Sequence, residues 1–219
     1  DSRLIFAGST RVGPSNNIGS PTLARSINFA PGASAFTLKG NGATIYGNIT
    51  NNSANAQTIN HGITMGAAIT LHAVSNALTI NGAVANGGYD LTVDGTNSYA
   101  VTLTNVLSGG GDIVKNGTNS LVLAGANTFT GQVAVNAGYV KIKSSSALGS
   151  GAGNTVVATP AQVTLDGSAG NITVNEAITV QGEYDWGAIM NIAGSNTWSG
   201  AVTLTGATQT RVSSFGGVL

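Results

Sequence analysis

Charged side chains are scarce in this sequence. Asp, Glu, Lys and Arg make up 7% of its 219 residues and the net charge is zero, whereas about 25% is typical of soluble proteins. The eight basic residues are scattered, and only Lys141 and Lys143 share a strand face, so no basic stripe is available for nucleic acid. The low charge argues against partners held by electrostatics, and solubility must depend on Thr, Ser and Asn.

Cysteine and long apolar runs are also absent. The lack of cysteine removes disulfides and thiol catalysis. Because the longest apolar runs are only a few residues, we expect no membrane insertion of this chain. No signal peptide is visible and the chain opens at Asp1, so we expect a processed product or a segment of a longer protein.

Glycine and asparagine divide the sequence into short strands. Residues 109–149 contain four alternations of apolar and polar residues, at 112–115, 121–123, 132–135 and 139–143. Turn residues such as Asn-Gly separate them. Alternation with a period of two, cut at these intervals, predicts strand and turn in succession, and nothing suggests a helix.

The same pattern recurs along the chain. Residues 124–135 correspond to 193–204, an offset of 69 residues. Residues 78–80 correspond to 101–103, 23 positions on, and then to 121–123, 20 positions further. A recurring unit of this size, built from short strands and turns, is typical of a β-solenoid. We therefore expect an all-β, single-stranded parallel β-helix with about 20–23 residues per rung.

The chain would form about ten rungs, a rod of about 48 Å. No linker or change of composition interrupts it, so residues 1–219 are predicted to form a single β-helix domain, either a segment of a longer protein or one subunit of a stacked fibre. Neither terminus resembles a cap, and uncapped ends favour edge pairing with another chain. The predicted end-to-end interface, through which the chain would self-associate, consists of Leu4, Ile5, Phe6, Phe215, Val218 and Leu219.

One stretch carries a family resemblance. Residues 115–131, followed by Val133 and 135–138, resemble the autotransporter-associated β-strand repeat, Lys-x-Gly-x-Gly-x-Leu-x-Leu-x-Gly-x-Asn-Thr-Tyr-x-Gly and then Thr-x-Val-x-x-Gly. The sequence departs from this pattern at Phe129, where Tyr is usual, and at Asn119, where Gly is usual. The resemblance implies a right-handed parallel β-helix on the outer-membrane surface of a Gram-negative bacterium or secreted from it, acting as a stalk, adhesin or fibre segment. It implies no catalytic residue, because the repeat is a structural unit.

The alternative is a carbohydrate-binding or carbohydrate-cleaving β-helix protein. Such sites need clustered carboxylates, often with Ca²⁺. Asp90 and Asp112 fall at equivalent rung positions, with Asp94 close in sequence, and are interpreted either as solvated turn carboxylates or as a pair that shares a cation. Lys115 is the only nearby cation and aromatic residues are sparse, so we expect no catalytic residue, no metal and no cofactor.

The repeat is least regular at four residues, Glu183, Tyr184, Asp185 and Trp186. On a strand, Glu183 and Asp185 would share a face about 7 Å apart. An acid pair beside aromatic rings is typical of a sugar contact, so these four residues are the predicted contact with a host or surface glycan; the other interpretation is an irregular loop. His61 and His72 have no third ligand candidate, so we expect solvent-facing or turn residues and not zinc ligands.

Overall fold

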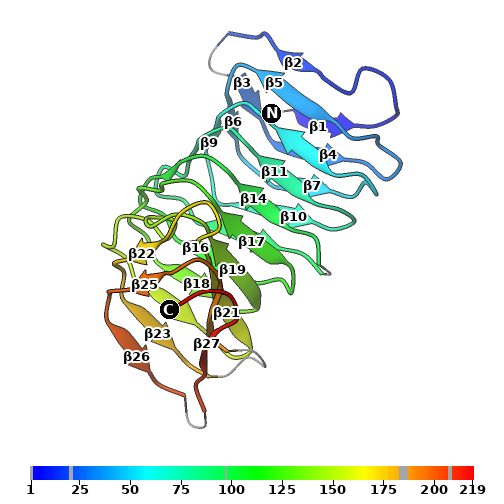
Figure 1. Cartoon of the computed structure of the whole chain (residues 1–219). Helices are drawn as coiled ribbons and strands as arrows, with labels where there is room; N and C mark the ends of the chain where they lie inside the picture. The colour runs from blue at the N-terminus through cyan, green and yellow to red at the C-terminus, as the bar shows by residue number, and fades with distance from the viewer. Residues whose placement is uncertain (1, 20–21, 97, 183–186, 207–208) are drawn as a thin grey trace.

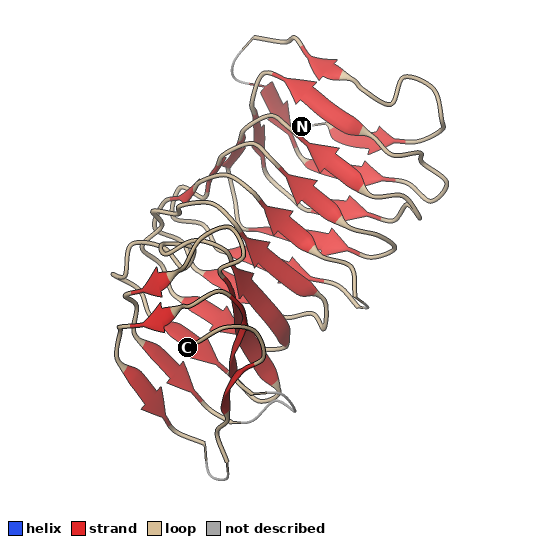
Figure 2. Cartoon of the chain, viewed as in Figure 1, coloured by secondary structure: helices blue, strands red, loops and turns tan. Residues whose placement is uncertain are grey.

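Short parallel strands stack in successive turns along a single axis (Figure 1). The computed structural model describes residues 2–19, 22–96, 98–182, 187–206 and 209–219. These residues form strands and loops (Figure 2), and none of them lies in a helix that could cross a membrane. The predicted all-β parallel β-solenoid is confirmed, with about nine turns.

Two sheets of ten strands each run along the length of the solenoid. In order, sheet 1 contains β1 (Arg3–Phe6), β4 (Ser26–Phe29), β7 (Ile49–Asn51), β10 (Ile69–Ala73), β13 (Leu91–Asp94), β16 (Ile113–Lys115), β18 (Val133–Val135), β20 (Thr155–Val157), β23 (Ile178–Val180) and β26 (Val202–Leu204). Sheet 2 contains β2 (Ser15–Asn16), β5 (Thr37–Gly40), β8 (Gln57–Ile59), β11 (Leu78–Ile80), β14 (Val101–Leu103), β17 (Ser120–Leu123), β19 (Gly138–Ile142), β21 (Ala161–Asp166), β24 (Ile189–Ala193) and β27 (Val212–Ser214).

The third side of the solenoid is less regular. Sheet 3 covers only the first five turns and contains β3 (Thr22–Ala24), β6 (Ala43–Ile45), β9 (Ile63–Met65), β12 (Val84–Ala85) and β15 (Leu107–Ser108). Further along the same side, β22 (Thr173–Val174) and β25 (Thr197–Trp198) form the two-stranded sheet 4. Loops close this side between the two sheets, so the backbone ladder is interrupted there.

The register of the ladders confirms the repeat. Leu78 pairs with Val101 and Val101 pairs with Leu121, as the sequence comparison predicts. The spacing varies more than expected: paired residues are 20 to 24 positions apart in sheet 1 and 19 to 27 in sheet 2. The strands keep their register while the corner loops absorb the difference in length.

Alternation along each strand builds one apolar core. Inward side chains stack on the equivalent side chain of the next turn, as in the column Ile59, Ile80, Leu103 and Leu123. Each of these side chains is at most 1% exposed. Full burial of an aliphatic side chain stabilises the fold by about 1.5–3 kcal/mol, so a repeated column of this kind is a main source of stability.

Asparagine side chains link successive turns both inside and outside the solenoid. Asn127 is buried, where its Oδ1 accepts a hydrogen bond from the Leu107 amide at 2.8 Å and its Nδ2 donates to the Ala147 carbonyl at 2.6 Å. Asn136 Nδ2 donates to Asn116 Oδ1 at 2.8 Å on the exposed side. Asn116 and Asn136 therefore stack on one another outside the solenoid, whereas Asn127 joins the backbones of two neighbouring turns inside it.

Gly138 provides a test of the tight spacing between turns. It begins β19 with φ +64°, and a Cβ there would lie 2.4 Å from the Asn119 carbonyl oxygen of the previous turn. Gly32 also has a positive φ, +79°, but nothing lies within 4 Å of its Cβ position. We expect Gly32→Ala to lower the free energy of unfolding by about 1 kcal/mol and Gly138→Ala by about 3 kcal/mol or more. Urea denaturation measures both, and equal losses would show that contact between turns does not restrict Gly138.

Candidate functional site

The two carboxylates predicted to stack are brought together by the register of sheet 1. Asp90 Oδ1 accepts a hydrogen bond from the Asp112 amide at 3.1 Å, and Asp112 Oδ1 accepts one from the Gln132 amide at 2.8 Å. Each carboxylate thus joins a corner to the following turn, which supports the turn-carboxylate interpretation. Across the described ranges, no group of three or more His, Cys, Asp or Glu residues is placed to hold a metal ion.

The sequence also points to residues 183–186 and to the two histidines as candidates. Glu183, Tyr184, Asp185 and Trp186 lie outside the described residues, so the glycan contact there stays a prediction. His61 is a turn residue as expected, but it is buried, with Nδ1 3.0 Å from the Gly62 carbonyl oxygen. His72 lies half-buried on β10.

At the N-terminal end of the solenoid, two of the three predicted interface residues are exposed. Leu4 and Ile5 lie on β1, the first strand of sheet 1 (Figure 1), and Ile5 is 62% exposed. Phe6 is instead half-buried. The centroid of its ring lies 5.4 Å from the ring centroid of Phe29 and 5.5 Å from that of Phe36. A mostly apolar hollow of about 450 Å³, lined in part by Leu4 and Phe6, opens at this end.

The C-terminal residues fold over the last turn. Phe215 and Val218 are 61% and 64% exposed, and Leu219 is also exposed. Val218 forms a parallel bridge with Ser195 of the preceding turn, and Asn191 Nδ2 donates to the Val218 carbonyl at 3.0 Å. The backbone of this segment is therefore held to the preceding turn, and its apolar side chains remain exposed at the end of the rod.

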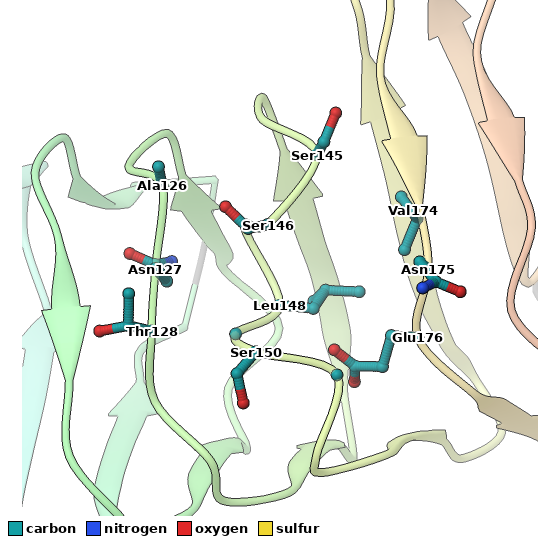
Figure 3. A pocket seen from close by; sticks show the side chains of 12 residues that line it. Ala126, Asn127, Thr128, Ser145, Ser146, Leu148, Ser150, Val174, Asn175 and Glu176 are labelled. Atoms are coloured by element: carbon teal, nitrogen blue, oxygen red, sulfur yellow. The ribbon is translucent and has the colours of Figure 1, made fainter.

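A further hollow of about 370 Å³ opens on the third side, between sheets 3 and 4 (Figure 3). Its walls include the loop at 145–151 and the segment 174–176, and Leu148 and Glu176 point toward one another across it. Because β22 pairs only with β25, its other edge faces this loop without a strand partner. One hydrogen bond spans the gap, from the Thr173 amide to Ser145 Oγ at 3.0 Å.

Among the described residues, Glu176 is the only ionisable one in the lining of this hollow. It faces inward at the corner between β22 and β23 and is 4% exposed. Burial raises the pKa of its carboxyl to about 7, opposed by the hydrogen bond that Thr155 Oγ1 donates to Oε1 at 2.6 Å. Glycoside hydrolysis commonly needs a second carboxylate about 5–10 Å away, and the part of the lining that the structure describes has none.

Lys115 is a second buried ionisable group. It is 0% exposed, and its ammonium donates to the carbonyl oxygens of Gly117 and Ala137. Burial lowers the pKa of Lys115 to about 8, opposed by the charge of Asp94. The sequence analysis did not predict this burial, although the alternation places Lys115 on the same face of its strand as the inward Ile113.

The raised pKa of Glu176 makes stability depend on pH. The unfolded chain loses this proton near the ordinary value of 4.5, whereas the folded chain keeps it up to about pH 7. Ionisation is therefore a cost to the folded state, and the free energy of unfolding falls as pH rises from 4.5 to 7. With allowance for solvent screening, this loss is about 2 kcal/mol.

Glu176→Gln should remove this part of the pH dependence while keeping an acceptor for Thr155. We therefore expect the variant to gain stability relative to the unmodified chain as pH rises from 4.5 to 7, measured by urea denaturation at several pH values. If the free energies of unfolding of the two proteins change with pH in the same way, the raised pKa assigned to the Glu176 carboxyl is wrong.

Comparison with known families agrees with the geometry. Residues 113–142 match the family model described as the passenger-associated-transport-repeat. This match spans β16 to β19 and includes Phe129, whose ring is 1% exposed, so the usual Tyr hydroxyl would be buried there. The comparisons with curated proteins and with solved structures each found no match. A passenger-associated transport repeat at residues 113–142, set within a parallel β-solenoid, supports an autotransporter passenger-type β-helix.

Proposed function

We propose that this chain is a structural rod on the outside of a Gram-negative cell, a stalk, adhesin or fibre segment. The observation that carries the proposal is the pair of ten-stranded ladders that joins the turns along the rod. Each turn is hydrogen-bonded to its neighbours and shares one core with them. Such a rod resists bending and proteolysis, because no turn opens without breaking the ladders on both sides. The passenger-associated repeat supports an extracellular location.

The proposal assigns the chain no catalytic activity. Asp90 and Asp112 accept hydrogen bonds from backbone amides of the next turn, and Glu176 has no second carboxylate beside it in its hollow. These contacts support structural roles for Asp90, Asp112 and Glu176.

Incubation with polysaccharides tests this assignment. We expect the chain to release no reducing ends from uronic-acid, neutral or sulfated polysaccharides between about pH 5 and 8, where the Glu176 carboxyl changes its protonation. Release that is lost in Glu176→Gln would replace the structural proposal with the carbohydrate-cleaving alternative.

We also propose that the rod stacks head to tail on a second copy of itself. Support comes from the two ends, each of which presents apolar side chains, Leu4 and Ile5 at one and Val218 and Leu219 at the other. At the N-terminal end the apolar hollow of about 450 Å³ offers a socket for such side chains. Contact between two different surfaces of identical chains produces an open filament.

Light scattering and electron microscopy test the stacking. We expect the chain to form longer rods as its concentration rises, because each added copy buries both end surfaces. Ile5→Lys and Val218→Lys should keep it monomeric by placing a charge in the contact. Tyr89→Lys, a change at an exposed aromatic residue away from both ends, is the control and should still stack. A chain that stays a short rod of uniform length at high concentration would refute stacking and leave the structural role intact.

A further inference from the structure

Charge is scarce in this chain but unevenly placed. Between residues 2 and 89 the sequence has no Asp or Glu, and its basic residues there are Arg3, Arg11, Arg25 and Lys39. Seven of the eight acidic residues lie from Asp90 onward. Salt screens charges over about 8 Å at physiological ionic strength. An anion near the first turns is therefore attracted by the local excess of positive charge, although the net charge of the whole chain is zero.

An open hollow of about 740 Å³ lies within this basic region, and we call it the N-terminal groove. Its lining includes Arg3, Arg25, Asn28, Tyr46, Asn48 and Asn52. Arg25 lies at the corner between sheets 3 and 1, and Arg3 pairs with the adjacent Ser26 in the register of sheet 1. The ladder therefore places two guanidinium groups, 22 positions apart in sequence, beside one groove.

Both arginines are available to a ligand. Arg3 and Arg25 are exposed, and neither forms an ion pair with any residue that the structure describes. Guanidinium groups bind carboxylate or sulfate oxygens through paired, charge-assisted hydrogen bonds. The groove is therefore suited to an anionic group.

Tyr46 adds an aromatic surface to the same groove. Its amide donates to the Ala24 carbonyl at 3.0 Å, which places it one turn from Arg25 at the same corner. Its ring packs on Gly66, where a Cβ would lie 2.5 Å from Tyr46 Cε1, and the residue is 42% exposed. A ring that is held from beneath and open to solvent provides a platform on which a sugar ring can lie.

Amide side chains complete the lining. Asn52 Nδ2 donates to Asn28 Oδ1 at 2.9 Å. The Asn28 amino group and the Asn52 oxygen have no other hydrogen-bond partner among the described residues. This ladder presents one donor and one acceptor, which is the pattern that sugar hydroxyl groups match.

We propose that the N-terminal groove binds an acidic oligosaccharide. Arg3 and Arg25 hold its carboxylate or sulfate, Tyr46 contacts the face of a sugar ring, and Asn28 and Asn52 bind hydroxyl groups. The volume of about 740 Å³ falls within the range of ordinary ligand pockets, about 300–1,000 Å³. This binding activity adds to the structural role and does not depend on stacking of the rod.

A nucleic acid fits the same features less well. Double-stranded DNA carries one charge per about 1.7 Å of helix axis and calls for an extended row of cations. The groove offers two arginines and one aromatic ring, and the six-residue set above contains no lysine. A glycan with widely spaced acidic groups is the better match.

Calorimetric titration with three defined hexasaccharides tests the proposal: one from hyaluronan with carboxylates only, one sulfated from heparin, and neutral maltohexaose. We expect one or both acidic oligosaccharides to bind, more weakly as salt rises, and the neutral one not to bind. Their comparison distinguishes a carboxylate from a sulfate ligand. Arg3→Gln and Arg25→Gln should each weaken binding about tenfold, and Tyr46→Ala should weaken it without changing its salt dependence.

Lys39→Gln is the matched control, because it removes one positive charge from the same region outside the groove. It should bind like the unmodified chain, and thermal denaturation should show that all four variants remain folded. The proposal is overturned if neither acidic oligosaccharide binds, if Lys39→Gln loses as much affinity as Arg25→Gln, or if a thymidine hexanucleotide binds as tightly as the acidic sugars.

Discussion

The parallel backbone ladder between successive turns is the constraint on which this structure depends. It places equivalent residues about 4.8 Å apart, so every side chain contacts the residue at its own position in the next turn. Aliphatic residues stack well at this spacing inside, as Ile59, Ile80 and Leu103 do, whereas like charges would repel one another. The low charge content of 7% follows from the same constraint, because Thr and Asn can hydrogen-bond to their own kind along the rod.

Some of the buried polar groups lie where the backbone leaves the ladder. Asn127, Lys115 and Glu176 are all buried and all lie at or beside corners. Asn127 and Lys115 satisfy backbone groups of the turns, and Glu176 accepts a hydrogen bond from Thr155. Burial without a charged partner at hydrogen-bond distance shifts the pKa of Lys115 down and that of Glu176 up, because each environment disfavours the charged form.

The two long ladders run the length of the structure, whereas the proposed binding groove occupies only its first turns. Sheets 1 and 2 continue from end to end and carry the stability of the rod. The Glu176 hollow lies on the third side, where the ladder is interrupted, and the proposed N-terminal groove lies over the outer face of sheet 1 and its corner with sheet 3. Variation at these positions changes the surface without breaking either long ladder, so a binding site can be added at little cost to the fold.

The sequence by itself determined the pattern of strands and turns, the approximate length of the repeat and the resemblance to a passenger repeat, because alternation and glycine positions are local signals. It also contained the inward alternation of Lys115 and Glu176, which marks both of these ionisable residues as buried. Only the tertiary structure decided which distant residues meet. Arg25 and Tyr46 share a corner, and Thr37, Thr58 and Thr79, scattered in sequence, form one outward column. The reason is physical: turns differ in length, so sequence spacing alone does not set the register, and the ladder hydrogen bonds do.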